Sequence, residues 1–540
     1  MESINTLLFR QMIESGANNL ANQHQEINAL NVFPVPDGDT GTNMNLTFTN
    51  GNTDVKKSLS TSVGELSKVL SKGLLMGARG NSGVILSQIF RGFATSVEGK
   101  ESISTLDLAE GFMKGKEVAY KAVMRPVEGT ILTVLRESSQ AAYDYVQLHP
   151  ETSIETYFVE LIKEAEVSLA HTPELLPVLK EVGVVDSGGA GFVAVIKGFE
   201  AAIAGQGIQR HADSDIEVSA GATMDHDEFG YCTEFIVRLN QNVQHVFKEN
   251  LFKKSLARLG NSIVVVQDDD LLKVHVHTLK PGDALNLGQR YGEFIKLKIE
   301  NMSEQHSHLN DIVDTGERDI PRKAIGLIAV AAGPGLKQAF EELRVDVVIS
   351  GGQTMNPSTE DFVAAIKRVN ADHVILLPNN SNIILAAQQA SSLVEDKTIH
   401  VLESKSIPQG LSACVMYNPD LAIDENLSEM QSALANTKTG EITYAIKDTT
   451  FDDVEIKEGD YMGIFGKSII VSTPSKLEAA KATVDAMVTP ESELLTLIRG
   501  EDASEEEVSE LETYIDDKFD IEVERIEGLQ PVYSFIIGVE

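Results

Sequence analysis

Cysteine is scarce in this chain: of its 540 residues only two are cysteines, Cys232 and Cys414. Two thiols cannot form the dense disulfide framework of a small secreted domain, and they suit a reducing compartment. We therefore expect a cytoplasmic protein. A chain of this length exceeds what one hydrophobic core can support, which predicts three or four domains.

Long apolar runs and a surplus of positive charge are also missing. No stretch of about 18 uncharged apolar residues occurs, which predicts no membrane insertion. The opening residues, MESINTLLFRQM, lack the basic start and apolar run of a secretory signal. Lys and Arg total 45 against 81 Asp and Glu, so the net charge is −36. That charge repels nucleic acid, and a bound polyphosphate would have to be held by metal ions and backbone amides.

The sequence contains neither of two common nucleotide-binding motifs in complete form. The segment GIFGKS, 463–468, resembles the end of a P-loop, but Tyr461 stands where the first glycine is required. The residues that follow, IIVSTP, predict a strand, and without a helix N-terminus the loop has no anion site. No GxGxxG follows a predicted strand, so a Rossmann dinucleotide site is not expected either.

The first part of the chain has apolar residues at helical spacing. The segments INTLLFRQMIESGANNLANQ and VGELSKVLSKGLLMGA repeat them every three or four residues. Further helical runs are predicted near 84–94, 105–123, 130–146, 153–169 and 189–204. We predict an all-α N-terminal domain over residues 1–205, folded as a bundle or helical barrel.

Beyond a polar break at 205–230, strands and helices alternate. The segments CTEFIVRL and SIVVVQDDDLLKVHVHT predict strands of a small α/β middle domain over 225–310. In 322–540, uniformly apolar strands alternate with helical crossovers, which predicts an α/β C-terminal domain with a parallel, doubly wound sheet. The acidic segment 499–528 is expected to be a solvated helix face, with a docking tail as the alternative.

The segment PVPDGDTGTNM, 34–44, places two carboxylates on either side of one glycine. Oxygen ligands in such a loop suit a hard divalent cation, and the spacing lets both carboxylates turn toward one point. The alternative is an Asx turn that caps the next helix. The candidate metal ligands are Asn31, Asp37 and Asp39, and the candidate phosphate contacts are Thr40, Gly41, Thr42 and Asn43.

Three more small-residue loops occur in the same helical domain. They are MGARGNSGVILSQIF at 76–90, RPVEGTILT at 125–133 and VVDSGGAGF at 184–192. Each opens a predicted helix, where exposed backbone N–H groups bind phosphate well. Four such loops in one all-α domain are hard to explain by packing alone.

The four motifs, DGDTGTNM, GNSG, VEGTIL and DSGGAG in this order, resemble the nucleotide-binding domain of the dihydroxyacetone kinase family. The whole chain resembles the ATP-binding subunits of bacterial fatty acid kinases. The resemblance implies a barrel of antiparallel helices that binds ATP through two Mg²⁺ ions held by aspartates. It also implies a homodimer, and phosphorylation of a fatty acid presented by a separate fatty-acid-binding protein.

The resemblance also assigns roles to residues. It makes Asp37 and Asp39 catalytic metal ligands and puts Asn31 near the place of a third aspartate, at a spacing one residue longer. The nucleotide contacts that it implies are Thr40 to Asn43, Asn81, Ser82, Gly129, Thr130, Asp186, Ser187 and Gly188. Two positions depart from the family pattern: Ser187 replaces the proline of an Asp-Pro-Gly that lines the nucleotide, and Gly129 replaces a lysine of the sugar-kinase version. The loss of that lysine is consistent with a different acceptor.

The predicted middle domain carries a second constellation. In LLKVHVHTL, His275 and His277 fall on one face of a strand, because side chains repeat every two residues. With Cys232 they could form a three-ligand Zn²⁺ site with one open position, and the alternative is a pair of half-buried histidines. The resemblance favours the metal, which would orient the acceptor carboxylate and make His275 catalytic.

Three functions are compatible with the sequence. The first is an ATP-dependent acyl kinase subunit. The second is a dihydroxyacetone-type kinase of small molecules, which would act without a lipid carrier. The third is a non-enzymatic nucleotide-binding scaffold. A carboxylate acceptor is already a nucleophile at neutral pH and needs no general base, whereas a sugar hydroxyl does, so the acceptor separates the first two.

Overall fold

The structure is a computed structural model, and it describes residues 3–31, 38–123, 126–211, 231–240, 247–256, 259, 261–268, 271–278, 280–301, 322–352, 356–445, 448–451, 454–466 and 468–540. The chain divides into two compact units. One unit is Met1–Ile216 together with Arg322–Glu540, and the other is Glu217–Pro321. Each is described by itself.

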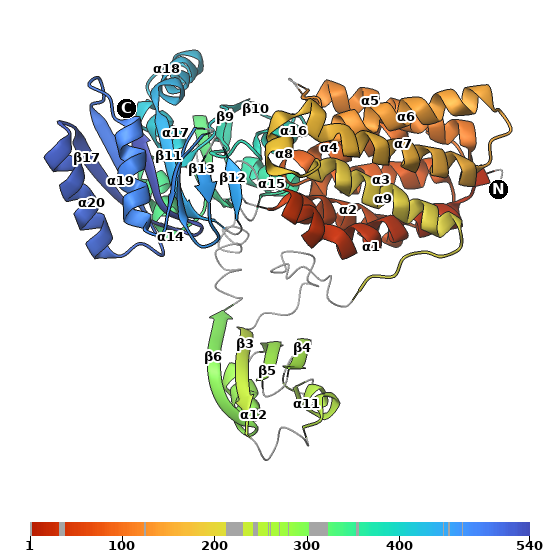
Figure 1. The fold of residues 1–540 in the computed structure, drawn as a ribbon, viewed down its shortest axis with the longest axis horizontal. Helices are drawn as coiled ribbons and strands as arrows, with labels where there is room; N and C mark the ends of the chain where they lie inside the picture. Colours follow the sequence, from red (N-terminus) through yellow and green to blue (C-terminus); the bar gives the residue numbers. More distant parts are fainter. Residues whose placement is uncertain are drawn as a thin grey trace. The chain divides into compact units, whose positions relative to one another are not determined.

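The N-terminal part of the first unit is helical, as the apolar spacing predicts (Figure 1). Its helices are α1 (Thr6–Leu30), α2 (Thr40–Lys57), α3 (Val63–Gly77), α4 (Gly80–Ser96), α5 (Thr105–Ala122), α6 (Ile131–Leu148), α7 (Ile154–Leu175), α8 (Pro177–Val182) and α9 (Ser187–Ile203). Two short strands, β1 (Ser3–Ile4) and β2 (Ile103–Ser104), pair antiparallel. Among the described residues, no helix has the length and apolar character needed to cross a bilayer.

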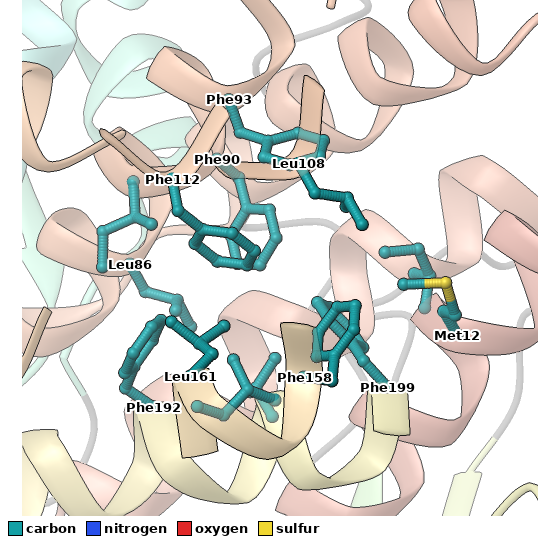
Figure 2. Close-up of a cluster of buried hydrophobic side chains, with 14 of the residues drawn as sticks. Met12, Leu86, Phe90, Phe93, Leu108, Phe112, Phe158, Leu161, Phe192 and Phe199 are labelled. Atoms are coloured by element: carbon teal, nitrogen blue, oxygen red, sulfur yellow. The ribbon is translucent and has the colours of Figure 1, made fainter. Parts of the chain in front are cut away.

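Aromatic and aliphatic side chains from most of these helices form one core (Figure 2). Phe90 lies edge to face with both Phe48 and Phe199, with ring centres 5.4 and 6.1 Å apart. Burial of each such aromatic side chain contributes about 1.5–3 kcal/mol to the free energy of unfolding. This core fixes the helices that carry the four glycine-containing loops.

The C-terminal part of the first unit contains a parallel sheet, as its apolar strands predict. The strands β7 (Lys323–Ala331), β8 (Val347–Ser350), β9 (Ala371–Leu377) and β10 (Thr398–Val401) pair in the order β10-β9-β7-β8. The associated helices are α14 (Pro334–Glu342), α15 (Thr359–Arg368), α16 (Ile384–Ser391), α17 (Ile407–Met416) and α18 (Ile423–Asn436). A cavity of about 260 Å³ lies beyond the carboxyl ends of β7, β8 and β9, where open parallel sheets bind ligands.

A second, mostly antiparallel sheet completes this part. It runs in the order β15-β14-β11-β18-β16-β17. Its strands are β11 (Lys438–Tyr444), β14 (Tyr461–Phe465), β15 (Ser468–Thr473), β16 (Leu494–Gly500), β17 (Glu522–Gln530) and β18 (Tyr533–Val539), with the hairpin β12 (Thr449–Phe451) and β13 (Val454–Ile456) beside it and the helices α19 (Lys476–Met487) and α20 (Glu505–Lys518). The P-loop lookalike therefore lies in the turn between β14 and β15, as its strand-like continuation predicts.

The acidic segment 499–528 contains the expected solvated helix face, since Glu505, Glu506 and Glu510 of α20 are exposed, but it also contains strands. Only α20 in its middle is helical, and β16 and β17 enclose it. Arg499 and Arg525 both form ion pairs with Glu505, and α20 buries Val508, Leu511 and Ile515. Its charges are therefore partly neutralised locally, and its apolar face belongs to a core.

The second unit contains one antiparallel sheet in the order β4-β5-β3-β6. Its strands are β3 (Tyr231–Leu239), β4 (Asn261–Asp268), β5 (Leu271–Thr278) and β6 (Gly292–Asn301), and its helices are α11 (Glu249–Leu256) and α12 (Pro281–Gln289). A core of Phe235, Phe252, Val274 and their neighbours joins sheet and helices.

Candidate functional site

The first residues of α2, α4, α6 and α9 lie at one end of the helical region. A Cβ built on Gly191 would be 2.5 Å from Met44 Sδ, so α9 and α2 touch one turn after each begins. A Cβ on Gly80, the first residue of α4, would be 2.7 Å from Asn43 Nδ2. Gly188 lies against Ile131, the first residue of α6, at 3.3 Å between Cβ positions. The four sequence motifs therefore meet.

The helices of this region differ in whether a side chain caps the N-terminus. Helices α1, α3, α5 and α7 follow the N-cap residues Asn5, Ser62, Ser104 and Ser153, whose side chains each accept a hydrogen bond from the first turn. Helices α2, α4 and α6 follow Asp39, Arg79 and Thr130, which make no such bond. Backbone N–H groups at an uncapped helix start suit an anion. Three of the four small-residue loops therefore lead into helices that lack an N-cap side chain, and Asp186 caps the helix that follows the fourth, α9.

Asp39 lies at the head of α2 and is 6% exposed. Burial raises the pKa of its carboxyl to about 6, against the opposing effect of hydrogen bonds from the Asn43 and Asn356 side chains. Asn356 Nδ2 donates to Asp39 Oδ2 at 2.5 Å. A carboxylate held out of water in this way favours a bound cation, whose charge offsets the cost of desolvation.

Two asparagines of α1 shape the loop around Asp39. Asn28 accepts from the backbone N–H of Thr42 at 3.0 Å and donates to its hydroxyl at 2.9 Å. Asn31 donates to the hydroxyl of Thr40 at 2.8 Å. Both threonines, together with Gly41 and Asn43, thus occupy the first turn of α2 in fixed positions. The predicted ligand Asp37 lies outside the described residues.

The second loop, which opens α4, is tied to α2. Gly80 has a φ of +57°, a left-handed conformation that favours glycine. Thr47 accepts from the backbone N–H of Arg79 at 3.2 Å and donates to the carbonyl of Asn43 at 2.7 Å. Asn81 and Ser82 follow in the first turn of α4, and the buried Oδ1 of Asn81 has no hydrogen-bond partner.

Asp186 joins the third and fourth loops. Its carboxylate accepts from the backbone N–H of Gly189 at 2.7 Å, which caps α9, and from the backbone N–H of Ile131. Burial raises its pKa to about 6, although both hydrogen bonds act in the opposite direction. Gly129, with a φ of +82°, and Thr130 precede Ile131, while Ser187 and Gly188 follow Asp186. Asp186 therefore fixes the conformation of both loops. The sequence predicts for it only a contact with the nucleotide.

The residues around Asp39 fit a hard divalent cation by their chemistry. Mg²⁺ prefers oxygen ligands, and this end of the helices offers the Asp39 carboxylate together with two buried amide oxygens that lack hydrogen bonds, Asn81 Oδ1 and Asn356 Oδ1. Within the described ranges no three His, Cys, Asp or Glu side chains group as a metal site. An ion here would therefore also depend on amides, water or the nucleotide.

Sequence reasoning missed two residues of this site. Asn356 and Arg79 are separated by 277 positions, yet Arg79 donates to the carbonyl of Asn356 at 2.8 Å. The only available signal was the position of Asn356, in a Gly, Thr, Asn and Ser loop that follows β8, since loops after parallel strands often bind ligands.

The candidate zinc residues fall on neighbouring strands of the second unit. Cys232 on β3 is the register partner of His277 on β5, and Glu234 is the partner of His275. The backbone positions are therefore adjacent. The side chains of the three candidates lie outside the description.

Comparison with known proteins then places the chain. Three family models match it: the DAK2 domain over 34–201, the FakA-like middle domain of fatty acid kinases over 228–309, and the FakA-like C-terminal domain of fatty acid kinases over 326–540. Protein YloV of Bacillus subtilis (strain 168) is 46% identical over 556 residues, covering 100% of both chains. The chain belongs to the FakA-like family of fatty acid kinase proteins.

Other similar proteins add less. The Staphylococcus epidermidis protein SERP0792 is 44% identical over 559 residues, again covering 100% of both chains. The solved dihydroxyacetone kinase of C. freundii is 13% identical with a TM-score of 0.29, and covers 56% of each chain. The DegV family protein Cg2579 of Corynebacterium glutamicum is 15% identical with a TM-score of 0.32, and covers 40% of this chain and 96% of its own. Scores this low do not establish a shared fold.

Proposed function

We propose that this protein transfers the γ-phosphoryl group of ATP to the carboxylate of a fatty acid, giving an acyl phosphate and ADP. Family membership supports a kinase, and one observation carries the nucleotide assignment. The buried carboxylate of Asp39 lies at the start of α2, and the start of α4, which lacks a side-chain cap, lies beside Asn43 and Asn356, the two partners of this carboxylate.

Each part of the site has a role in this reaction. Bound Mg²⁺ would offset the negative charge of the phosphates. Asp39, together with Asp37, Asn31, Asn81 and Ser82, would hold metal and nucleotide. Backbone N–H groups at the start of α4 would bind phosphate oxygens. A chain of net charge −36 cannot attract phosphate by its overall field.

The acceptor and its delivery are the less direct part of the proposal. A carboxylate is already a nucleophile at neutral pH, so no general base has to be placed beside it. A strongly acidic protein avoids anionic membranes, so a separate fatty-acid-binding protein would bring the substrate to a homodimer of this chain. Zn²⁺ held by Cys232, His275 and His277 would orient the carboxylate.

Trapping of the acyl phosphate with hydroxylamine tests the reaction. The full chain is incubated with ATP, Mg²⁺ and a fatty acid, with and without a bacterial fatty-acid-binding protein. We expect acyl hydroxamate only when all components are present, and none with Asp39→Asn. Phosphorylation of dihydroxyacetone without a carrier would favour the small-molecule kinase instead. Nucleotide binding with no transfer to either acceptor would favour the scaffold.

A further inference from the structure

Asn356 brings a side chain from the C-terminal α/β region to the candidate nucleotide site. It lies between β8 and α15, within the stretch matched by the family's C-terminal domain and outside the stretch matched by the DAK2 domain. It is 1% exposed, and its Nδ2 donates to Asp39 Oδ2 across 317 positions of sequence. A polar side chain buried this deeply has a defined partner because an unpaired one is costly.

The backbone on both sides of this contact is also joined. Arg79, at the start of the second glycine-rich loop, pairs with Ser358 in an antiparallel bridge. Its guanidinium donates to the carbonyl of Asn356 and lies 3.8 Å from the carboxylate of Asp361. The backbone N–H of Thr359 donates to the carbonyl of Ala78 at 3.1 Å. These bonds hold Asn356 and the glycine-rich loop as one structure.

Apolar packing supports the same contact. Ala78 and Val84, from the loop and first turn of α4, belong to a buried cluster with Ile328, Phe362 and Ile383 of the α/β region. Gln389 of α16 donates to the carbonyl of Leu75 at 3.0 Å. The α/β region thus covers the residues that open α4, and any movement of one displaces the other.

One polar atom of the Asn356 side chain lacks a hydrogen-bond partner. Its Oδ1 is buried and has no hydrogen-bond partner, and the same holds for Asn81 Oδ1. An unsatisfied buried acceptor costs about 1–3 kcal/mol. A hard cation at Asp39, or a water bound to that cation, would give the neighbouring Asn356 oxygen the partner that it lacks.

We propose that Asn356 is part of the metal–nucleotide site, so that the kinase site is complete only when the C-terminal α/β region is docked on it. This inference rests on the proposed function. Rotation of the amide exchanges Nδ2 and Oδ1, so one side chain can donate to the bare Asp39 carboxylate and offer its oxygen to a cation held there. Because coupling is reciprocal, nucleotide binding also strengthens docking of the α/β region.

Titration calorimetry with ADP and Mg²⁺ tests this on the full chain, independently of turnover. We expect Asn356→Ala to weaken binding by roughly 10–100-fold, as loss of a residue that supports a metal ligand does. The matched control is Asn426→Ala, which removes another fully buried asparagine of the α/β region, one that bonds to its own loop at Asn418. It is expected to leave nucleotide affinity unchanged.

Hydrogen exchange supplies the second readout. In the wild type, ADP and Mg²⁺ should slow exchange in 356–366 and in 75–84, and in Asn356→Ala the slowing in 356–366 should be lost. Unchanged binding of ADP and Mg²⁺ by Asn356→Ala would overturn the inference. Tighter binding would also overturn it, because the contact between Asn356 and Asp39 would then oppose nucleotide binding. Failure of the wild type to bind ADP with Mg²⁺ would instead refute the proposed function, so the two failures are distinguishable.

Discussion

Replacement of Gly41 by alanine tests how closely α1 and α2 must approach to form the site. Gly41 is the second residue of α2, and a Cβ there would lie 2.1 Å from the carbonyl oxygen of His24 and 2.9 Å from Asn28 Oδ1. The carbonyl belongs to the backbone of α1 and cannot rotate away. The two helices would have to separate by roughly 1 Å, a shift that well-packed interiors resist.

The cost follows from two opposing effects. Overpacking of this kind costs up to about 3 kcal/mol, and the higher helix propensity of alanine returns up to about 1 kcal/mol. The net loss of about 2 kcal/mol corresponds to a Tm lower by roughly 4–8 °C for a region of this size. The displacement also breaks the paired bonds between Asn28 and Thr42, and misplacement by about 1 Å can lower the rate of phosphoryl transfer roughly 100-fold.

Thermal unfolding and the hydroxamate assay measure both effects in the full chain. The control is Gly207→Ala, because Gly207 has no heavy atom within 4 Å of a built Cβ and does not have a positive φ. We expect the control to match the wild type. If Gly41→Ala unfolded at the wild-type temperature with full activity, the close helix contact would not be what positions Asp39.

Three further predictions concern single side chains. Burial raises the pKa of Glu441, which lines the C-terminal cavity, from 4.5 to about 7. The folded state therefore loses stability as the pH rises from about 4.5 to 7, because the buried carboxyl has to ionise. Glu441→Gln removes this loss, so its free energy of unfolding, relative to that of the wild type, should be up to about 3 kcal/mol higher at pH 8 than at pH 5 in denaturant titrations. Asp186→Ala leaves the backbone N–H groups of Gly189 and Ile131 without their acceptor and should cost about 1–3 kcal/mol in urea unfolding, whereas Asp186→Asn should cost less; equal losses would contradict the capping role. If zinc is bound as proposed, elemental analysis should find about one Zn²⁺ per wild-type chain and much less in His275→Ala, and a metal-free wild type would refute that site.

Local patterns carry much of the fold. Helical spacing in the first part of the chain predicts α1 and α3, because a helix buried on one face has an apolar residue every three or four positions. Short, uniformly apolar runs in alternation with helices predict the parallel sheet of β7 to β10, because its strands are buried on both faces. The acidic segment is predicted in part: its charges correctly indicate a solvated face on α20, but they do not indicate the strands β16 and β17 on either side of it. Arg499 and Arg525 pair with Glu505 across strands that local composition does not predict.

The candidate site divides in the same way. Its glycine-containing loops are visible in sequence because each opens a helix, and Asp39 is visible because a carboxylate beside glycine in such a loop is chemically distinctive. Asn356 could not be found, because its contact with Asp39 joins two regions through a tertiary hydrogen bond. The capping difference between α2 and α3 was equally hidden, since it depends on side-chain geometry rather than on residue type.

Magnesium-dependent binding of ATP, measured by titration calorimetry on the full chain and on Asp39→Asn, tests the central claim most directly. Asparagine keeps the size of the side chain at the head of α2 and removes its charge. We predict saturable binding by the wild type that is lost without Mg²⁺, and affinity at least roughly 100-fold lower in the variant, since a ligand of the metal is weakened. Equal affinity in the two proteins, or no binding by the wild type, would contradict the account.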